Sequence, residues 1–309
     1  MKPQARPFEQ LGLIGCGLMG GSFALALKRA GLVRRVVGYS KSPSTTTRAR
    51  RMGVIDVTAS SALLAASRSD LILLAVPVAA TGDTLEAIRR VVGHQALIMA
   101  VGSTKTDVVA AARRVLRNDV GKFVPCHPIA GREVSGIEHA SAALYQGAQV
   151  VLTPIERTLT SQLAQATAVW EALGCHVRVM SPDAHDAAFA AVSHLPHLLA
   201  FAYMTGITRQ PDGAEYLSLA GTGFEDFSRI AGASPRMWRD IFSANQQQLL
   251  VQLSHFKQAL QQLEALIASG DAAALETTLV GASEARTQWR PASASATDAG
   301  SARPRRTAS

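Results

Sequence analysis

The stretch Leu11–Ser22, LGLIGCGLMGGS, decides the fold of this chain. Its first four residues predict a buried strand, and Gly15-x-Gly17-x-x-Gly20 opens a helix expected to run to about residue 30. Gly15 allows a tight turn, Gly17 lets the backbone approach a pyrophosphate, and Gly20 lets the helix pack on the strand. The phosphates would lie at the helix N-terminus, so the stretch predicts a dinucleotide-binding fold. The expected cofactor contacts here are Gly15, Cys16, Gly17, Leu18, Met19 and Gly20.

The end of the next predicted strand, Arg35–Tyr39, bears on the choice of cofactor. An acidic residue there would bond the ribose 2′-hydroxyl of NAD, but this chain has Ser40. Hydroxyl groups and cations follow, and they suit the 2′-phosphate of NADP, which a carboxylate would repel. The sequence therefore predicts NADP, with NAD possible; an alternative is a solvated helix start capped by Ser42 or Ser44. The residues expected at the 2′-phosphate are Ser40, Lys41, Ser42 and Arg48.

Strands and helices continue to alternate, which predicts an α/β domain with a parallel sheet. The segments AVPV, Ala75–Val78, and VGSTK, Val101–Lys105, fall at the carboxyl ends of strands, where such a sheet binds its ligand. We therefore add Val76, Pro77 and Gly102 to the cofactor site. The expected strands are Asp70–Pro77, Ala96–Val101, Phe123–Pro125, Ala148–Leu152 and Cys175–Met180. The expected helices are Thr81–Val92, Thr104–Leu116 and one that contains Trp170.

The segment CHPIAGREVSG, Cys126–Gly136, presents a candidate catalytic base. Pro128 fixes its own φ and biases His127 toward an extended backbone, while Gly131 and Gly136 permit a tight path. We expect a stiff loop that emerges at the carboxyl edge of the sheet and holds the imidazole. The alternative is a surface turn with an incidental histidine.

Composition narrows the class of protein. The chain has 309 residues, 48% apolar and 17% charged, enough for a large core in two domains. Residues 1–56 hold 10 basic and 2 acidic side chains, and the remainder holds 21 of each, so the net charge of +8 is local. This favours a small anionic ligand over a nucleic acid; an ordinary solvated surface is the alternative. The three cysteines lack the spacing of a metal site or a disulfide framework, and the apolar runs are expected to be too short for a membrane span. With no signal peptide expected, these features predict a cytoplasmic protein.

The pattern changes to helices alone after Pro182. Long apolar helices without a sheet to cover predict a domain that packs against a second copy, so we expect a homodimer. The last residues are rich in Ser, Ala and Arg and are expected to be disordered, although their RPRR could touch nucleic acid. The expected helices are Asp183–Ile207, Pro235–Ile267 and Asp271–Thr287. The expected domains are 1–181 for the dinucleotide, 182–290 for substrate and dimerisation, and 291–309 as a basic tail.

Five motifs together resemble the prephenate and arogenate dehydrogenase family. They are GCGLMGGS, VGSTK, HPIAGREVSG, AVSHLPH and GFEDFSRIAGASPRMWRDIFSAN, in that order and spacing between Phe8 and Arg290. The resemblance implies a Rossmann-like domain followed by a helical dimerisation domain. It implies oxidative decarboxylation of prephenate, arogenate or both, with hydride transfer to NADP or NAD, in tyrosine biosynthesis.

The same resemblance assigns roles to residues. It implies that His127 bonds and polarises the ring hydroxyl of the substrate with help from Ser103, and that Arg229 grips a carboxylate with Asp226 orienting it. His194, His197 and Trp238 would line the cleft; as alternatives, they are core residues, or the histidines with His185 form a metal site, which the chemistry does not need. We expect no metal.

Two positions depart from the family pattern. Arg132 adds a cation after HPIAG and is a candidate substrate contact, while Glu225 replaces a common basic residue. Both could affect the choice between prephenate and arogenate. The competing readings are a β-hydroxyacid dehydrogenase, whose GGVSGG-like segment and Lys-x-x-Asn pair are missing, and a non-catalytic NADP-binding protein.

Overall fold

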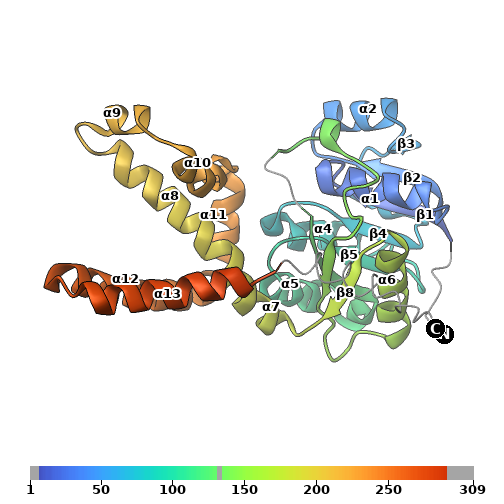
Figure 1. The fold of residues 1–309 in the computed structure, drawn as a ribbon. Helices are drawn as coiled ribbons and strands as arrows, with labels where there is room; N and C mark the ends of the chain where they lie inside the picture. Colours follow the sequence, from blue (N-terminus) through green and yellow to red (C-terminus); the bar gives the residue numbers. More distant parts are fainter. Residues whose placement is uncertain (1–6, 131–133, 291–309) are drawn as a thin grey trace, which may run out of the picture. The chain divides into compact units, whose positions relative to one another are not determined.

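A computed structural model describes residues 7–130 and 134–290. These residues contain an eight-stranded sheet of order β3-β2-β1-β4-β5-β6-β7-β8, which confirms the predicted Rossmann-like α/β fold (Figure 1). Neighbouring strands are parallel except β6 and β7. The strands are β1 (Phe8–Ile14), β2 (Val33–Tyr39), β3 (Val57–Thr58), β4 (Leu71–Leu74), β5 (Leu97–Ala100), β6 (Phe123–Ile129), β7 (Gln149–Leu152) and β8 (His176–Val179).

Alternate residues of the central strands enter two different apolar cores, one on each face of the sheet. In β4, Leu71 and Leu73 belong to the core that contains Phe23 and Trp170, whereas Ile72 and its neighbours of the same parity join the other. The near-continuous apolar run of each strand follows from burial on both faces. The helices of this part are α1 (Leu18–Arg29), α2 (Pro43–Arg51), α3 (Ala62–Ala66), α4 (Thr81–Ile88), α5 (Thr106–Leu116) and α6 (Thr160–Ala172), with short turns η1 (Val78–Ala80), η2 (Arg117–Lys122) and η3 (Ile137–His139).

Strand β6 corrects the expectation of a wholly parallel sheet and of a histidine on a loop. It continues four residues beyond Pro125, so His127 lies inside the strand, opposite Val151 of the antiparallel β7. Strand β5 pairs with β6 only as far as Pro125. At Pro128, therefore, β6 forms no hydrogen bonds with β5 on that side. A proline, which has no N–H, is tolerated at such a position.

The described residues after β8 form helices joined by short connections (Figure 1). The predicted helix Pro235–Ile267 is broken at Asn245. Residues up to Leu249 form one compact unit, and the described residues from Leu250 onward form another. The elements are α7 (Pro182–Phe189), η4 (Ala190–His194), α8 (Leu195–Thr208), α9 (Gly213–Ser218), α10 (Thr222–Ser228), η5 (Arg229–Gly232), α11 (Pro235–Ala244), α12 (Gln246–Ser269) and α13 (Ala272–Gln288).

The elements α7, η4 and α8 form one continuous helical path with a wide π turn at Ala190–His194. The turn lies just before Pro196, which has no N–H to donate to the preceding turn. Counted as one helix, Pro182–Thr208 is long and apolar enough to cross a membrane, so the expectation that every apolar run is too short was wrong. Only 17% of its most apolar window is buried, which leaves an apolar surface to be covered.

Candidate active site

The glycine-rich turn between β1 and α1 has the geometry that its sequence predicts. Gly15 has a φ of +100°, and a Cβ there would meet the Ala75 carbonyl oxygen at 2.2 Å. A Cβ on Gly20 would meet the Gly15 oxygen at 2.1 Å, so both positions require glycine. Around Gly17, the N-cap of α1, a Cβ would meet nothing within 4 Å. This open space beside a helix N-terminus fits a pyrophosphate group.

The expected 2′-phosphate residues lie at the end of β2 and the start of α2. The backbone N–H of Cys16 donates to Ser40 Oγ at 3.1 Å, so Ser40 ties the glycine-rich turn to β2. Ser42 is the N-cap of α2, but its hydroxyl contacts Ser44 Oγ rather than capping the helix. Arg48 forms an exposed ion pair with Glu138 at 3.1 Å.

The other cofactor candidates lie at the carboxyl edge of the sheet. Val76 and Pro77 follow β4, and Gly102 and Ser103 follow β5. A Cβ on Gly102 would lie 2.8 Å from Val78 Cγ1, so this turn is closely packed. Ser103 is partly buried. These residues thus lie at the carboxyl edge of the sheet, where the sequence predicts them.

A chain of hydrogen bonds runs from His127 into the helical segment. Nδ1 of His127 lies 2.8 Å from Nε2 of His185, and Nδ1 of His185 lies 2.8 Å from Oδ1 of Asp186. Because a carboxylate only accepts, His185 Nδ1–H donates to Asp186, and His185 Nε2 must then accept from His127 Nδ1–H. This tautomer leaves Nε2 of His127 with a lone pair. His127 is therefore arranged to accept a proton.

Burial keeps both rings neutral. It lowers the pKa of His127 well below the ordinary 6.5, and the charge of Lys105 acts in the same direction, as a proton on His185 or His194 would. Burial also lowers the pKa of His185, which its bond to Asp186 opposes. Phe189 packs on both rings, with centroid distances of 4.5 Å to His127 and 4.4 Å to His185, and so restricts water.

Asp186 connects the histidine pair to the start of α5. Its carboxylate accepts from the backbone N–H groups of Lys105, at 2.9 Å, and Thr106, at 2.8 Å. Burial alone would raise the pKa of Asp186, but the bonds from His185 and Thr106 outweigh it and lower that pKa. Asp186 is therefore a buried carboxylate that fixes the tautomer of His185.

Asn245 joins this chain to the second pair of histidines. Its Nδ2 donates to the Asp186 carbonyl oxygen at 2.8 Å and lies 3.2 Å from His194 Nδ1. Burial lowers the pKa of His194 to about 4, so the ring is neutral and can accept this bond. Nε2 of His194 is buried and lacks a hydrogen-bond partner among the described residues.

Trp238 packs between the predicted cleft histidines. Its ring stacks on His197 at 3.7 Å and meets the edge of His194 at 6.0 Å. His197 Nδ1 donates to the Ser193 carbonyl oxygen at 2.9 Å. Trp238 is 6% exposed and belongs to a small apolar core with Ile241, so the core alternative for this residue is correct as far as packing goes.

The predicted carboxylate grip belongs to α10 and η5. Asp226 and Glu225 are exposed on α10, and the exposed Arg229 begins η5, which contacts α8. Arg132 and Gly131 lie outside the described residues. The helix α11 contacts η1, and this brings the helical segment to the carboxyl edge of the sheet.

Sequence reasoning missed three residues of this network. From the sequence, His185 is a candidate only as a metal ligand, and no role is predicted for Asp186 or Asn245. The available signal was the DAHD segment directly after the helix start at Pro182, and the asparagine that ends the last motif. Among the residues the structure describes, no group of three or more His, Cys, Asp or Glu side chains could hold a metal ion.

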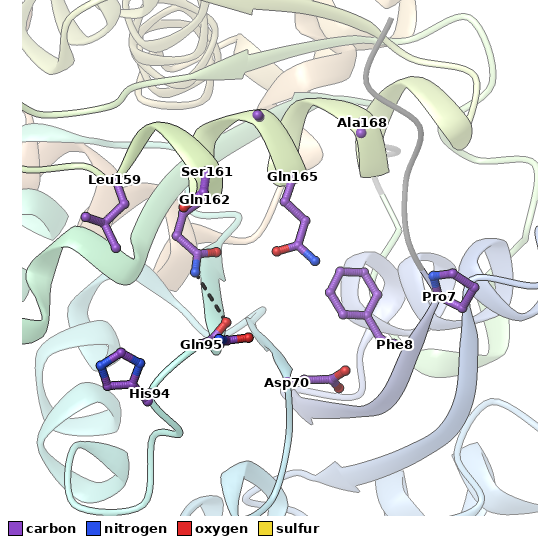
Figure 2. Close-up of a pocket in the computed structure, with 11 residues that line it drawn as sticks. Pro7, Phe8, Asp70, His94, Gln95, Leu159, Ser161, Gln162, Gln165 and Ala168 are labelled. Carbon is purple, nitrogen blue, oxygen red and sulfur yellow. Dashed lines mark hydrogen bonds between the residues drawn. The ribbon is translucent and has the colours of Figure 1, made fainter.

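A cavity of about 810 Å³ lies away from this network (Figure 2). It is lined by Phe8, which begins β1, by Asp70 just before β4, and by Gln95 just before β5. These are the amino ends of parallel strands, the edge opposite to the one where such sheets bind nucleotides. Gln162 Nε2 donates across it to the Gln95 carbonyl oxygen at 3.2 Å. The cavity is therefore not our candidate for the active site.

Comparisons with known proteins cover both parts of the chain. The family models for the nucleotide-binding and dimerization domains of prephenate dehydrogenase match residues 23–179 and 181–280. A cyclohexadienyl dehydrogenase of Zymomonas mobilis is 33% identical over 266 residues, 85% of this chain and 90% of that protein. A prephenate dehydrogenase of Bacillus subtilis is 33% identical over 84% of this chain and 70% of its own length.

Two solved structures share the whole architecture. Prephenate dehydrogenase from Aquifex aeolicus, in complex with hydroxyphenyl propionate and NAD+, superposes with a TM-score of 0.85 at 33% identity, covering 91% of this chain and 98% of that one. Arogenate dehydrogenase from Synechocystis superposes with a TM-score of 0.78 at 31% identity, covering 91% and 100%.

Proposed function

The chain belongs to the prephenate dehydrogenase family, and on that premise we propose how its own residues carry out the oxidative decarboxylation of prephenate, arogenate or both in tyrosine biosynthesis. It is an NAD(P)-dependent dehydrogenase. The observation that carries the mechanism is the chain of hydrogen bonds from His127 through His185 to Asp186, because it leaves an unprotonated ring nitrogen where the substrate hydroxyl would bind.

His127 acts on the hydroxyl at C4 of the substrate ring. Its Nε2 accepts the hydroxyl proton, and Asp186 stabilises the positive charge that then spreads over the two histidines. When bound, a nicotinamide would accept the hydride released from C4 as the C4–O bond becomes a carbonyl. As the ring carboxylate leaves as CO2, its bonding electrons move through the ring onto that oxygen, which takes back a proton from His127. Ser103 hydrogen-bonds the same hydroxyl from the turn after β5.

Substrate carboxylates are held by Arg229, with Asp226 as the residue that orients it. Arginine can fork onto a carboxylate, which supports this role. His194, His197 and Trp238 line the cleft on the helical side. Arg132 adds a cation near the side chain of the substrate, where prephenate carries a keto group and arogenate an amino group.

The cofactor we propose is NADP, with NAD as the second choice. The absence of an acid after β2 supports it, because Ser40 can donate its hydroxyl hydrogen to a 2′-phosphate while it accepts from Cys16. Lys41, Ser42 and Arg48 add two positive charges and a hydroxyl group nearby. The glycine-rich turn from Gly15 to Gly20 holds the pyrophosphate, and Val76, Pro77 and Gly102 border the nicotinamide half.

We place the functional domains at 1–181 and 182–290 and expect a cytoplasmic homodimer that contacts neither nucleic acid nor membrane. A dimerization-domain match over residues 181–280 supports the dimer. The apolar exposed residues of the helical segment support it as well, since such surfaces are usually covered by a partner. The basic tail, residues 291–309, lies outside the described residues.

The test is reduced-cofactor formation with prephenate and with arogenate, each with NAD and with NADP. Wild-type protein should be active with at least one pair, and its kcat/KM should fall only as the pH drops below the ordinary histidine value of 6.5, because the lowered pKa keeps His127 neutral above that. His127→Asn should reduce kcat by roughly 10²- to 10⁴-fold. Cofactor affinity, measured by fluorescence titration, should not change.

No activity with any of the four pairs would contradict the function. Unchanged turnover in His127→Asn would remove His127 from the role of base. A matched control is His176→Asn, a substitution at the exposed first residue of β8, which should leave the rate as it was.

A further inference from the structure

Lys105 carries a buried charge that has no role in the proposed mechanism. It ends the VGSTK segment and is the N-cap residue of α5. Its side chain is 0% exposed, and within the described part of the chain its Nζ has no hydrogen-bond partner. Lysine is almost never fully buried unless it is paired, because removing an ammonium group from water is costly. A functional requirement would explain why a lysine occupies this buried position.

The main chain of Lys105 is linked to the histidine pair by three consecutive hydrogen bonds. Its N–H donates to Asp186 Oδ1 at 2.9 Å, and the same oxygen accepts from His185 at 2.8 Å. His185 in turn contacts His127 at 2.8 Å. Lys105 is therefore held in a fixed place relative to the ring that takes the substrate proton.

The titratable groups that interact electrostatically with Lys105 come from three elements. Strand β6 contributes Cys126 and His127, helix α7 contributes His185 and Asp186, and α5 contributes Asp107. Burial raises the pKa of Cys126 to about 12, so this thiol is uncharged. Burial lowers the pKa of Lys105 to about 8, which leaves it largely charged at neutral pH. His127 also interacts with His185 of α7 and His194 of η4. Both of these rings are neutral at that pH.

We propose that Lys105 is a positioning residue for the catalytic base: its buried ammonium group, carried by a backbone that Asp186 ties to the His127–His185 pair, keeps the pair unprotonated and ready to accept the substrate proton. This inference rests on the proposed role of His127. A positive charge close to an imidazole opposes a second positive charge on it, and the low polarity of the site strengthens that effect. Since His127 titrates at a pH far below 8, Lys105 remains charged throughout that titration.

The decisive experiment compares pH profiles of kcat/KM for wild type and Lys105→Met. Methionine has a similar length and no charge. The acid limb should move to higher pH by about one unit, because a neighbouring charge typically shifts a pKa by one unit or more. Lys105→Arg, which restores the charge, should return the limb toward the wild-type position. An acid limb that stays in place in Lys105→Met overturns the proposal, even if kcat falls.

The matched control is Lys122→Met. Lys122 is also buried, at 8% exposure, but it pairs with Asp119 at 2.7 Å just before the amino end of β6. This substitution should leave the acid limb where it is. A limb that moved equally in both variants would show a general effect of lost charge and would also overturn the proposal.

Two further measurements do not depend on turnover. In wild-type protein, the His127 ring followed by NMR should titrate well below 6.5, and titration at the ordinary value overturns the proposal whether or not the variants fold.

The second measurement is thermal stability. Because burial lowers the pKa of Lys105 from 10.5 to about 8, the unfolded chain binds more protons than the folded chain between these pH values, and the stability of the fold rises with pH there. Lys105→Met should therefore have a higher Tm than wild type at pH 7, with the difference shrinking above pH 8; a lower Tm at pH 7 contradicts the buried charge. An inactive wild type would instead reject the proposed function and leave these two results interpretable.

Discussion

Ser40 shows how a single side chain can serve both the fold and the choice of cofactor. Its Oγ accepts the N–H of Cys16, so it supports the glycine-rich turn, and its hydroxyl hydrogen is available to a ligand. A carboxylate at this position could accept the same N–H. The residue can therefore be changed to an acid without removing the bond that holds the turn.

Ser40→Asp should shift preference from NADP toward NAD. The added carboxylate would repel a 2′-phosphate, and a repulsion of about 1.4 kcal/mol is a tenfold change in affinity. The measurement is the ratio of kcat/KM for the two cofactors. Ser40→Ala is the control, since it removes the hydroxyl group without adding charge and should change the ratio less. If Ser40→Asp left the ratio unchanged, our interpretation of this strand end would be wrong.

Arg229→Ala should weaken substrate binding. Hydrogen bonds between charged groups contribute about 1.5–3 kcal/mol, so KM for the substrate should rise roughly ten- to a hundredfold. The cofactor dissociation constant should be unaffected. The control is Arg236→Ala. Arg236 is also an exposed arginine but lies in α11, and this variant should behave as wild type. Normal saturation kinetics in Arg229→Ala would contradict the carboxylate assignment.

Individual site residues differed in how far the sequence could reveal them. Gly15 and Gly20 were predictable because backbone geometry permits no other residue there. His185, Asp186 and Asn245 were not, since their roles depend on contacts between segments about 60 residues apart. A pattern along one element gives no information about such partners.

At the scale of elements, Asn245 marks the place where local pattern reasoning failed. The apolar periodicity continues through it, so one helix was predicted, but its side chain donates to the Asp186 carbonyl and contacts His194. These tertiary contacts hold the chain between α11 and α12. The prediction for the end of β6 was wrong for a related reason. Pro128 and the glycines after it suggested a loop, whereas pairing with β7 extends the strand through His127. Long-range pairing overrode local preference in both cases.

Asn245→Ala should destabilise the compact unit that contains the site. The substitution leaves the buried Asp186 carbonyl without this donor, which typically costs about 1–3 kcal/mol. Thermal unfolding should show a lower Tm, and kcat should also fall because Asp186 and His194 lose a shared contact. The chain has one other asparagine, Asn118, which is exposed in η2, and Asn118→Ala should change neither quantity. A wild-type Tm for Asn245→Ala would show that the contact is not stabilising.

At the scale of the whole molecule, the sequence correctly predicted a Rossmann-like part followed by helices, because strand and helix periodicities are strong signals over long segments. Which apolar side chains of the helical part remain exposed was harder to predict. Helix α13 has no buried residue, and apolar side chains such as Leu279 are half exposed on it. A groove of about 360 Å³ runs along this helix between Leu275 and Val280.

Leu279→Glu should convert the proposed dimer to a monomer. If a second copy covers this face, a buried carboxylate without a partner would oppose association. Sedimentation velocity at micromolar concentration would measure the change in mass. Leu64→Glu is the matched control, because Leu64 of α3 is 52% exposed and Leu279 is 53% exposed. Equal masses for wild type and Leu279→Glu would exclude this face from the interface.

The wide turn at Ala190–His194 makes the length of this segment as important as its composition. His185 and His194 are nine residues apart, and in a regular helix of 3.6 residues per turn they would point to roughly opposite sides. The wider turn reduces that separation, which lets both rings join the network around Asp186. Deleting one residue here would rotate all of α8 by about 100°. We therefore expect natural and engineered variants to accept many side chains at Val192, the exposed position of this turn, but neither an insertion nor a deletion within it.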